Sequence, residues 1–206
     1  VLLVKRGERH AMEFETTETY IKFDETGKIS DIVPRTRGDS HKLIEEMMLL
    51  ANTCAATFSL KHELPVLYRN HDTPEAEKAA RVSDFVKHFG LSFPEENPTQ
   101  ADYQRIIEAT RERPDAISIH SVLLRSMQQA NYSPTNIGHF GLAYDEYSHF
   151  TSPIRRYPDL MLHRGIKQKV TGKKAPIPDW SLEDAGEQTS MTERRADEAS
   201  RFVEQW

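Results

Sequence analysis

An apolar stripe with helical spacing, between residues 43 and 58, constrains the fold of this chain more than any other feature of the sequence. Its members recur every three or four positions, which predicts a long amphipathic helix: Leu43, Ile44, Met47, Met48, Ala51, Cys54, Ala55 and Phe58. Asp39 or Ser40 can cap the start of this helix. We expect it to run to about Lys61, because Pro65 cannot continue it.

Three side chains take their expected surroundings from this helix. Cys54 lies on the stripe, which predicts a buried thiol. Glu45 and Glu46 lie off the stripe, so we expect solvated carboxylates, with a polar channel as the alternative for one of them. Because Cys54 is the only cysteine, an internal disulfide and a cysteine-rich zinc site are excluded. A reducing cytoplasm is the compartment that fits this cysteine count.

The other segments predict an α+β fold with a mixed sheet and long helices. Residues 16–23 and 28–33 are rich in β-branched and aromatic types and flank a turn at 24–27, which predicts a hairpin. A strand is expected at 66–69, turn-rich chain at 131–136, β character at 138–148 and a linker at 172–178. Further helices are expected at 74–90, 99–111, 115–130 and 180–206, and another is expected to start at 152–153. The 206 residues suffice for one domain with a sizeable core.

The charge pattern is uneven. The formal net charge of −5 argues against a uniformly basic nucleic-acid binder. Residues 151–174, however, hold seven lysines or arginines against Asp159 as the only acidic residue. This block is either a local phosphate-binding surface or a solvated helix face. Neither an export signal nor an apolar run long enough to cross a membrane is visible, so no membrane partner is expected.

Residues 149–159 are the most informative stretch for chemistry. Ser152 as a cap followed by Pro153 predicts a helix start, and free backbone N–H groups in a first turn attract anions. Arg155 and Arg156 would stand in that turn, where a bound phosphate would offset their unfavourable interaction with the helix dipole. The alternative is that one arginine pairs with a nearby carboxylate. Pro158 should kink this helix or delay its regular start.

Aromatic and histidine side chains offer further candidates. Phe14 lies between two glutamates, which fits a core residue of a strand or, alternatively, a residue that stacks on a base. None of the nine histidines shows the spacing of paired metal ligands. His139 and His149 flank a β-like segment, where strand capping or core packing is the ordinary interpretation. We also count His139 among the candidate substrate-binding residues. No aspartate cluster of the kind that holds two magnesium ions is present.

Several strings of the sequence, in order, resemble the catalytic (RNB) domain of the ribonuclease II/ribonuclease R family. These are His41–Asn52 (HKLIEEMMLLAN), Leu123–Met127 (LLRSM), Gly138–Ala143 (GHFGLA), His149–Leu160 (HFTSPIRRYPDL) and Met191–Ala199 (MTERRADEA). The second and last of them are more similar to the ribonuclease R branch. The resemblance extends over essentially the whole chain and is more specific than any single motif.

The resemblance implies a processive hydrolytic 3′→5′ exoribonuclease that degrades single-stranded RNA to nucleoside 5′-monophosphates with magnesium held by aspartates. Arg155 would correspond to the catalytic arginine at the phosphate of the cleavage centre, and Glu46 to a glutamate near the terminal nucleotide. Phe14 would match the aromatic clamp, although its context, Ala11–Phe14, departs from the family pattern. Arg156 and His139 would be further substrate contacts.

Residues 1–206 are therefore expected to be the C-terminal portion of such a catalytic domain, with the metal-binding N-terminal portion and the OB-fold domains absent. No metal ligand is assigned in this chain, and we expect the fragment alone to be inactive. Uncovered apolar faces would then favour self-association. The alternative function is a catalytically inactive RNA-binding or interaction module on the same scaffold.

Overall fold

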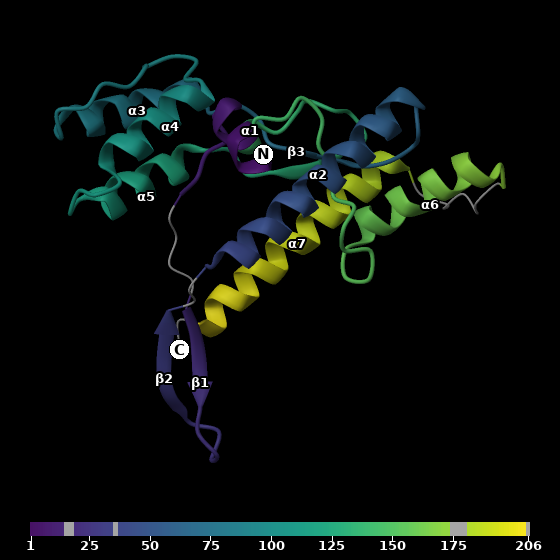
Figure 1. Cartoon of the computed structure of the whole chain (residues 1–206), viewed down its shortest axis with the longest axis horizontal. Coiled ribbons are helices and arrows are strands. Elements are labelled where there is room, and N and C mark those ends of the chain that lie inside the picture. Colours follow the sequence, from purple (N-terminus) through teal and green to yellow (C-terminus); the bar gives the residue numbers. More distant parts are fainter. Residues whose placement is uncertain (15–18, 35–36, 174–180, 205–206) are drawn as a thin grey trace.

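The computed structural model describes residues 1–14, 19–34, 37–173 and 181–204. Its helices and short strands form an α+β fold, which confirms the predicted class (Figure 1). The predicted mixed sheet is wrong, because the named strands form two separate antiparallel pairs. In chain order the elements are α1 (Leu2–Glu8), β1 (Thr19–Phe23), β2 (Ile29–Pro34), α2 (Asp39–Lys61), β3 (Tyr68–Asn70), α3 (Ala76–Lys87), α4 (Gln100–Thr110), α5 (Ala116–Ser126), β4 (Asn131–Ser133), the 3₁₀ helix η1 (Phe140–Leu142), α6 (Tyr157–Thr171) and α7 (Leu182–Glu204).

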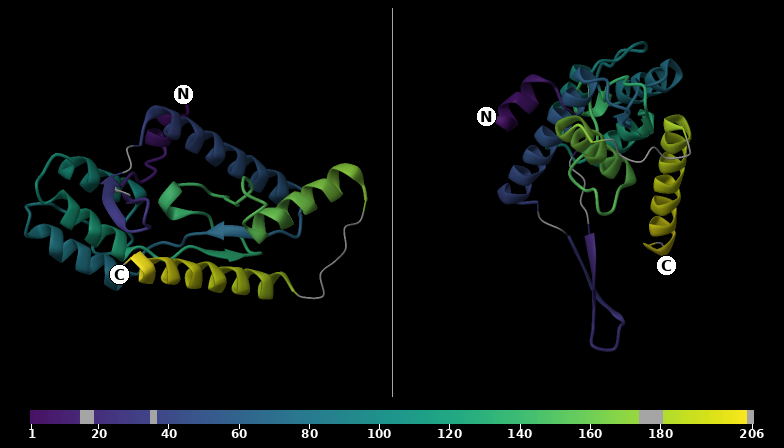
Figure 2. Two further views of the ribbon diagram at one scale, coloured as in Figure 1. Left: turned by 90° about the horizontal axis from the view of Figure 1, so that it is seen from below. Right: turned by 90° about the vertical axis from the view of Figure 1, so that its right-hand side faces the viewer.

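Strands β1 and β2 form the predicted hairpin, which projects away from the rest of the protein (Figures 1 and 2). Ile21 stands opposite Ile32 in its antiparallel register. The Asp24 carboxylate closes the turn by accepting a hydrogen bond from the Thr26 N–H at 2.8 Å. The first residues of the expected strand, Thr16–Glu18, lie outside the described residues, as does most of the expected linker, Lys174–Pro178.

The second sheet is the antiparallel pair β3–β4, with Arg69 opposite Tyr132. Helices α2 and α7 lie on opposite sides of it (Figure 2, left). Helix α7 approaches β4 so closely that a Cβ on Gly186 would lie 2.7 Å from the Tyr132 carbonyl oxygen. The strand predicted near 66–69 is confirmed, although it begins two residues later and ends one residue later. The turn predicted at 131–136 is wrong at its start, because Asn131–Ser133 pair with β3 as a strand.

Helices α3, α4 and α5 confirm three of the predicted helices and pack into a separate apolar core. The core includes Val82, Val86, Phe93, Tyr103, Ile106, Ile107, Ile119, Leu123 and Phe140. Phe140 comes from η1, so this helical group is joined directly to the irregular chain that precedes α6. That chain, 138–148, was predicted as β structure. It has instead isolated bridges and one 3₁₀ turn, with Gly138 and Ala143 both at positive φ.

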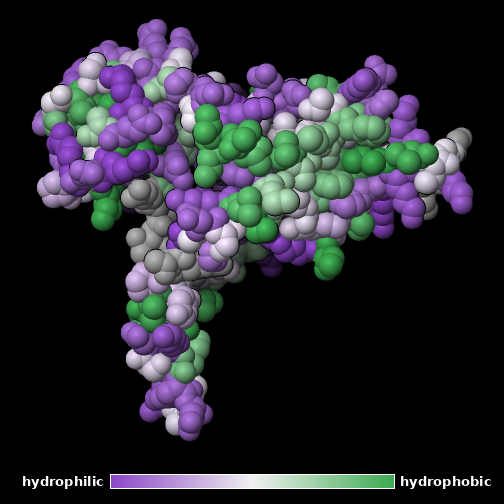
Figure 3. Space-filling model, in the orientation of Figure 1, coloured by the Kyte–Doolittle hydropathy of each residue, from purple (hydrophilic) through white to green (hydrophobic). Residues whose placement is uncertain are grey.

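Helix α2 ends where predicted, although its N-cap is Gly38 rather than Asp39 or Ser40. Most of its apolar stripe does not face the rest of the chain, and Ala55 is the buried member of that stripe. The side packed inward carries small and polar residues: Glu46, Asn52, Ala55, Ala56 and Ser59. Leu43, Ile44, Met47 and Leu50 are exposed, and Figure 3 shows apolar patches over α1 and α2 on this face. The predicted burial of Cys54 is therefore wrong, since its thiol is exposed on the outer side.

In the described part of the chain, no helix is both long enough and apolar enough to span a bilayer.

Candidate active site

The turn that carries Arg155 is built differently from the helix start predicted at Ser152. Helix α6 begins at Tyr157, with Arg156 as its N-cap. A helix starting near Pro153 would need a hydrogen bond from the backbone nitrogen of Pro158, which has no hydrogen. The delayed start is one of the two outcomes predicted for Pro158, which lies in the first turn. Ahead of it, the Ser152 carbonyl accepts the N–H groups of Arg155 and Arg156 at 3.3 and 3.1 Å.

The two arginines of this turn point to different surroundings. Asp159 is fully buried, and one of its carboxylate oxygens accepts a bond from the Ser152 N–H at 2.7 Å and another from the Arg156 guanidinium at 2.8 Å. Arg156 is thus the arginine that pairs with a carboxylate, the alternative raised for the pair. Arg155 is exposed and makes no ion pair within the described residues. The turn therefore offers one arginine to solvent and draws the other inward.

A series of buried and half-buried aromatic rings lies beneath this turn. The ring centroids of His71 and His139 are 5.0 Å apart, those of His139 and Tyr147 5.2 Å, and those of Tyr147 and His149 5.7 Å. Tyr132 continues the series, and its hydroxyl bonds His149 Nδ1 at 2.8 Å. Of the two interpretations of His139 and His149 from the sequence, strand capping and core packing, this arrangement matches core packing, because both rings pack against Tyr147.

Burial and positive charge keep these histidines neutral. Burial, and then the nearby charges of Arg156 and Arg69, lower the pKa of His149 to about 2. Burial, His71 and Arg69 lower the pKa of His139 to about 3. Neutral histidines leave the positive potential near the turn to the arginines. Burial also raises the pKa of Tyr132 to about 12, so its hydroxyl stays protonated.

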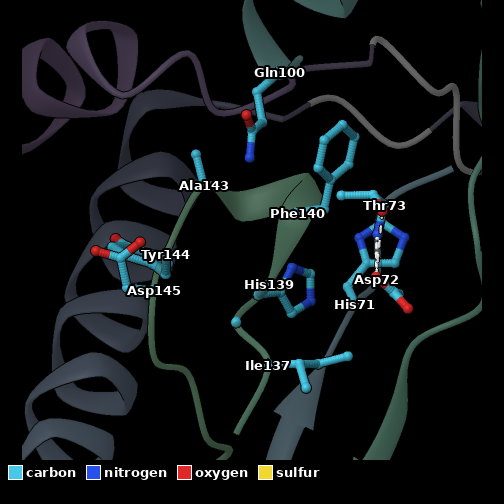
Figure 4. Close-up of a pocket in the computed structure, with 11 residues that line it drawn as sticks. His71, Asp72, Thr73, Gln100, Ile137, His139, Phe140, Ala143, Tyr144 and Asp145 are labelled. Carbon is cyan, nitrogen blue, oxygen red and sulfur yellow. Dashed lines mark hydrogen bonds between the residues drawn. The ribbon is translucent and has the colours of Figure 1, made fainter. Parts of the chain in front are cut away.

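His139 also lines a pocket of about 290 Å³ (Figure 4). Its Nδ1 accepts the Leu142 N–H at 3.2 Å, which in the neutral ring leaves the proton on Nε2. His71 borders the same pocket and accepts the Gly141 N–H at 2.9 Å, a contact that leaves no room for a side chain at Gly141. Around these rings the lining is polar, with Asp72, Thr73, Gln100 and Asp145 among its members.

Glu46 faces the protein rather than solvent. Its side chain is 5% exposed and pairs with Arg6 of α1 at 2.8 Å. The solvated carboxylate predicted at this position is therefore wrong, since α2 turns its polar side inward. Glu45 is at the surface, where Arg37 lowers its pKa by a hydrogen bond.

Phe14 follows α1 in irregular chain rather than in a strand. It packs against the core of α3–α5, with its ring 6.1 Å from that of His120. Phe14 therefore packs on the core, as one of its two interpretations predicted, but from irregular chain and not from a strand. The structure thus brings Arg155, Arg156 and His139 to one region around the rings, and places Glu46 and Phe14 beside the segment that begins with α1.

Sequence reasoning missed three residues that bond the chain at or just before the Arg155 turn. Asn52 and His163 bond the backbone of Phe150, and the buried Asp159 bonds the Ser152 N–H. A lone amide in the apolar stretch 47–58 was the available signal for Asn52. No group of three or more His, Cys, Asp or Glu in the described residues is arranged to hold a metal ion. These residues do not fit a magnesium site.

The RNB domain family matches residues 1–172. The chain therefore belongs to the RNB domain family. Its relatives include ribonuclease R of Vibrio cholerae, 46% identical over the whole chain and 27% of that protein, and ribonuclease R of Escherichia coli, 44% identical over the whole chain and 27% of that protein. The chain thus spans about a quarter of the length of the curated relatives it matches.

Solved structures confirm the fold. Mycoplasma genitalium RNase R in complex with ribose-methylated single-stranded RNA matches with a TM-score of 0.88 and 24% identity, over 98% of this chain and 33% of that one. Yeast Ssd1, described as a pseudonuclease, matches with a TM-score of 0.63 and 24% identity, over 76% of this chain and 20% of that one. The RNB fold therefore occurs in proteins described both as nucleases and as a pseudonuclease.

Proposed function

We propose that this chain is part of a hydrolytic, processive 3′→5′ exoribonuclease that degrades single-stranded RNA to nucleoside 5′-monophosphates in the cytoplasm. The observation that carries the proposal is the turn at 152–156, which presents Arg155 to solvent while Arg156 is bound to Asp159. The ribonuclease R relatives, at 44–46% identity over the whole chain, support the same substrate.

In this proposal Arg155 contacts the phosphate at the cleavage centre. A guanidinium fits two phosphate oxygens at once and neutralises the charge that builds on them during cleavage. The basic side chains of α6 would guide the backbone, which makes the contacts independent of base sequence. Arg156 was a candidate substrate contact, but its bond to Asp159 favours a role within the turn.

The remaining candidates would contact the end of the strand. His139 can donate from Nε2 into its pocket, whose neighbouring carboxylates Asp72 and Asp145 accept from amino groups of bases and repel phosphate. Phe14 would stack on a terminal base, and Glu46 would lie near the terminal nucleotide. A divalent ion is consistent with a hydrolytic nuclease family. We propose that this ion is Mg²⁺, held by carboxylates outside this chain.

The test is exonuclease activity of the intact protein that carries this chain, on a 5′-labelled single-stranded oligoribonucleotide. We expect shortening from the 3′ end with release of nucleoside 5′-monophosphates. Arg155→Ala should lower the turnover by about 10²–10³ and the affinity much less. An enzyme with unchanged turnover and only weaker binding would show that Arg155 merely positions the strand.

The second candidate function is an RNA-binding or interaction module without catalysis. The similarity in fold to yeast Ssd1, a pseudonuclease, supports this alternative. Tight RNA binding by the intact protein without any shortening, at all divalent-ion concentrations tried, would establish this function in place of the first.

A further inference from the structure

The chain just before Arg155 is held by side chains from two helices. On the α2 side, the buried Asn52 carboxamide oxygen accepts the Phe150 N–H at 2.9 Å. The amide nitrogen of Asn52 donates to the Tyr147 hydroxyl at 2.8 Å. One side chain of α2 thus bonds the Tyr147 side chain and the Phe150 backbone.

Helix α6 holds the same segment from the other side. His163 Nε2–H donates to the Phe150 carbonyl at 2.8 Å, and the two rings stack with centroids 4.1 Å apart and planes 5° apart. Asp159 accepts the Ser152 N–H two residues further on. Both backbone polar groups of Phe150 are therefore satisfied by side chains, one from each helix.

No regular ladder fixes this stretch, since residues 149 and 150 belong to neither a helix nor a strand. The chain before it is tied to β3 and its approach, because the Tyr147 carbonyl accepts the Arg69 N–H at 2.9 Å and the Ser148 hydroxyl donates to the Leu67 carbonyl at 2.6 Å. From Phe150 to Ser152 its course depends on the bonds from Asn52, His163 and Asp159. Buried backbone groups are seldom left without a hydrogen-bond partner. If one of these bonds is removed, the backbone should therefore move until the freed group finds another partner. The movement would be transmitted to Arg155, five residues after Phe150.

We propose that Asn52 is a positioning residue for Arg155, because it fixes Phe150 and thereby the place at which the arginine meets an RNA phosphate. The proposal rests on the proposed RNA-binding function. The proposal also links Arg155 to Glu46, because α2 carries both Glu46 and Asn52. One rigid helix would then position both Arg155 and Glu46 relative to the RNA.

The variant Asn52→Leu tests this, because leucine has a similar shape and can make neither bond. Thr57→Val is the matched control, since it removes another hydrogen bond from α2, to Glu146 at 2.7 Å, without touching Phe150. Asn52→Asp is the conservative variant, because the Tyr147 hydroxyl can donate to the second oxygen. The readout is affinity of the 206-residue chain for a labelled single-stranded oligoadenylate across a salt series.

We expect Asn52→Leu to weaken binding about threefold or more. The slope of log affinity against log salt concentration should decrease in magnitude by about 0.7, the change expected for Arg155→Ala. Combined with Arg155→Ala, it should weaken binding no further. Asn52→Asp should restore much of the affinity, and Thr57→Val should leave it unchanged. A loss that is equal with and without the Arg155→Ala substitution would show that Asn52 only supports the fold.

Hydrogen exchange of the RNA-free chain separates this proposal from the proposed function. The Phe150 amide should exchange about tenfold faster or more in Asn52→Leu and at the original rate in Thr57→Val. Failure of the unsubstituted chain to bind RNA would contradict the RNA-binding function, whereas an unchanged Phe150 exchange rate would contradict the positioning role.

A second variant covers the case in which Asn52→Leu does not fold. His163→Phe keeps the ring stacked on Phe150 and removes only the bond to its carbonyl. We expect it to reduce affinity in the same direction, again only when Arg155 is present. A reduction that persists in the Arg155→Ala background would overturn the proposal.

Discussion

The ion pair beneath the turn should stabilise the fold rather than bind RNA, and Asp159→Asn tests this. The substitution keeps the shape and one acceptor oxygen but leaves the Arg156 charge without its partner. Asp159 is fully buried and the Arg156 side chain is 19% exposed. Loss of one partner from a buried pair typically costs 3–5 kcal/mol. Because Arg156 is partly solvated, we expect about 3 kcal/mol here.

The assay is thermal and urea unfolding of the 206-residue chain. For a chain of this size, about 3 kcal/mol corresponds to a decrease in Tm of about 6–12 °C. Arg156→Met should cost a similar amount without changing the salt dependence of RNA binding. Asp197→Asn, which alters an exposed carboxylate on α7, is the control and should change stability by less than about 0.5 kcal/mol.

Two results would refute this reasoning. A loss below about 1 kcal/mol for Asp159→Asn would mean that solvent already satisfies the Arg156 charge. A salt slope reduced by Arg156→Met as much as by Arg155→Ala would mean that both arginines contact phosphates, as the family resemblance implies.

Three further predictions concern the chain as a whole. Its free energy of unfolding should fall below about pH 6.5, by about 1.4 kcal/mol per pH unit for each of His139 and His149. In the folded chain their pKa values are about 3 and 2, so they bind protons in this range only after unfolding. An unchanged urea midpoint from pH 7 to 5 would contradict this. The 206-residue chain with magnesium should not shorten a labelled oligoribonucleotide, since its described residues hold no metal site; steady release of mononucleotides would disprove it. It should also self-associate through the exposed apolar residues of α2, so light scattering should show mass rising with concentration, and a strict monomer would contradict that.

The local elements of this fold could be predicted because their signals are local. The period of the apolar positions and the prolines located α2 and the helices of the α3–α5 group, and the turn at 24–27 located the hairpin. Strand β4 could not be found this way. Asn131 favours turns, and the strand exists because residues 61 to 65 positions earlier pair with it.

The candidate site was predictable in composition and less so in geometry. The string around Arg155 identified the family and drew attention to Pro158, but it did not decide which arginine is exposed. That choice depends on the burial of Asp159, which comes from the packing of α6. The side-chain bonds of Asn52 and His163 to Phe150 join positions 98 and 13 residues apart, and no local pattern encodes the first.

The geometry of α2 limits where residues can be inserted into or deleted from this protein during evolution. Glu46 and Asn52 are six positions apart, about 9 Å along the helix axis. Insertion of one residue between them would rotate Asn52 by about 100° relative to Glu46 and shift it by about 1.5 Å. Either the pair with Arg6 or the bond to Phe150 would then be lost. Insertions and deletions should therefore be tolerated at the tip of the β1–β2 hairpin and selected against between these two residues.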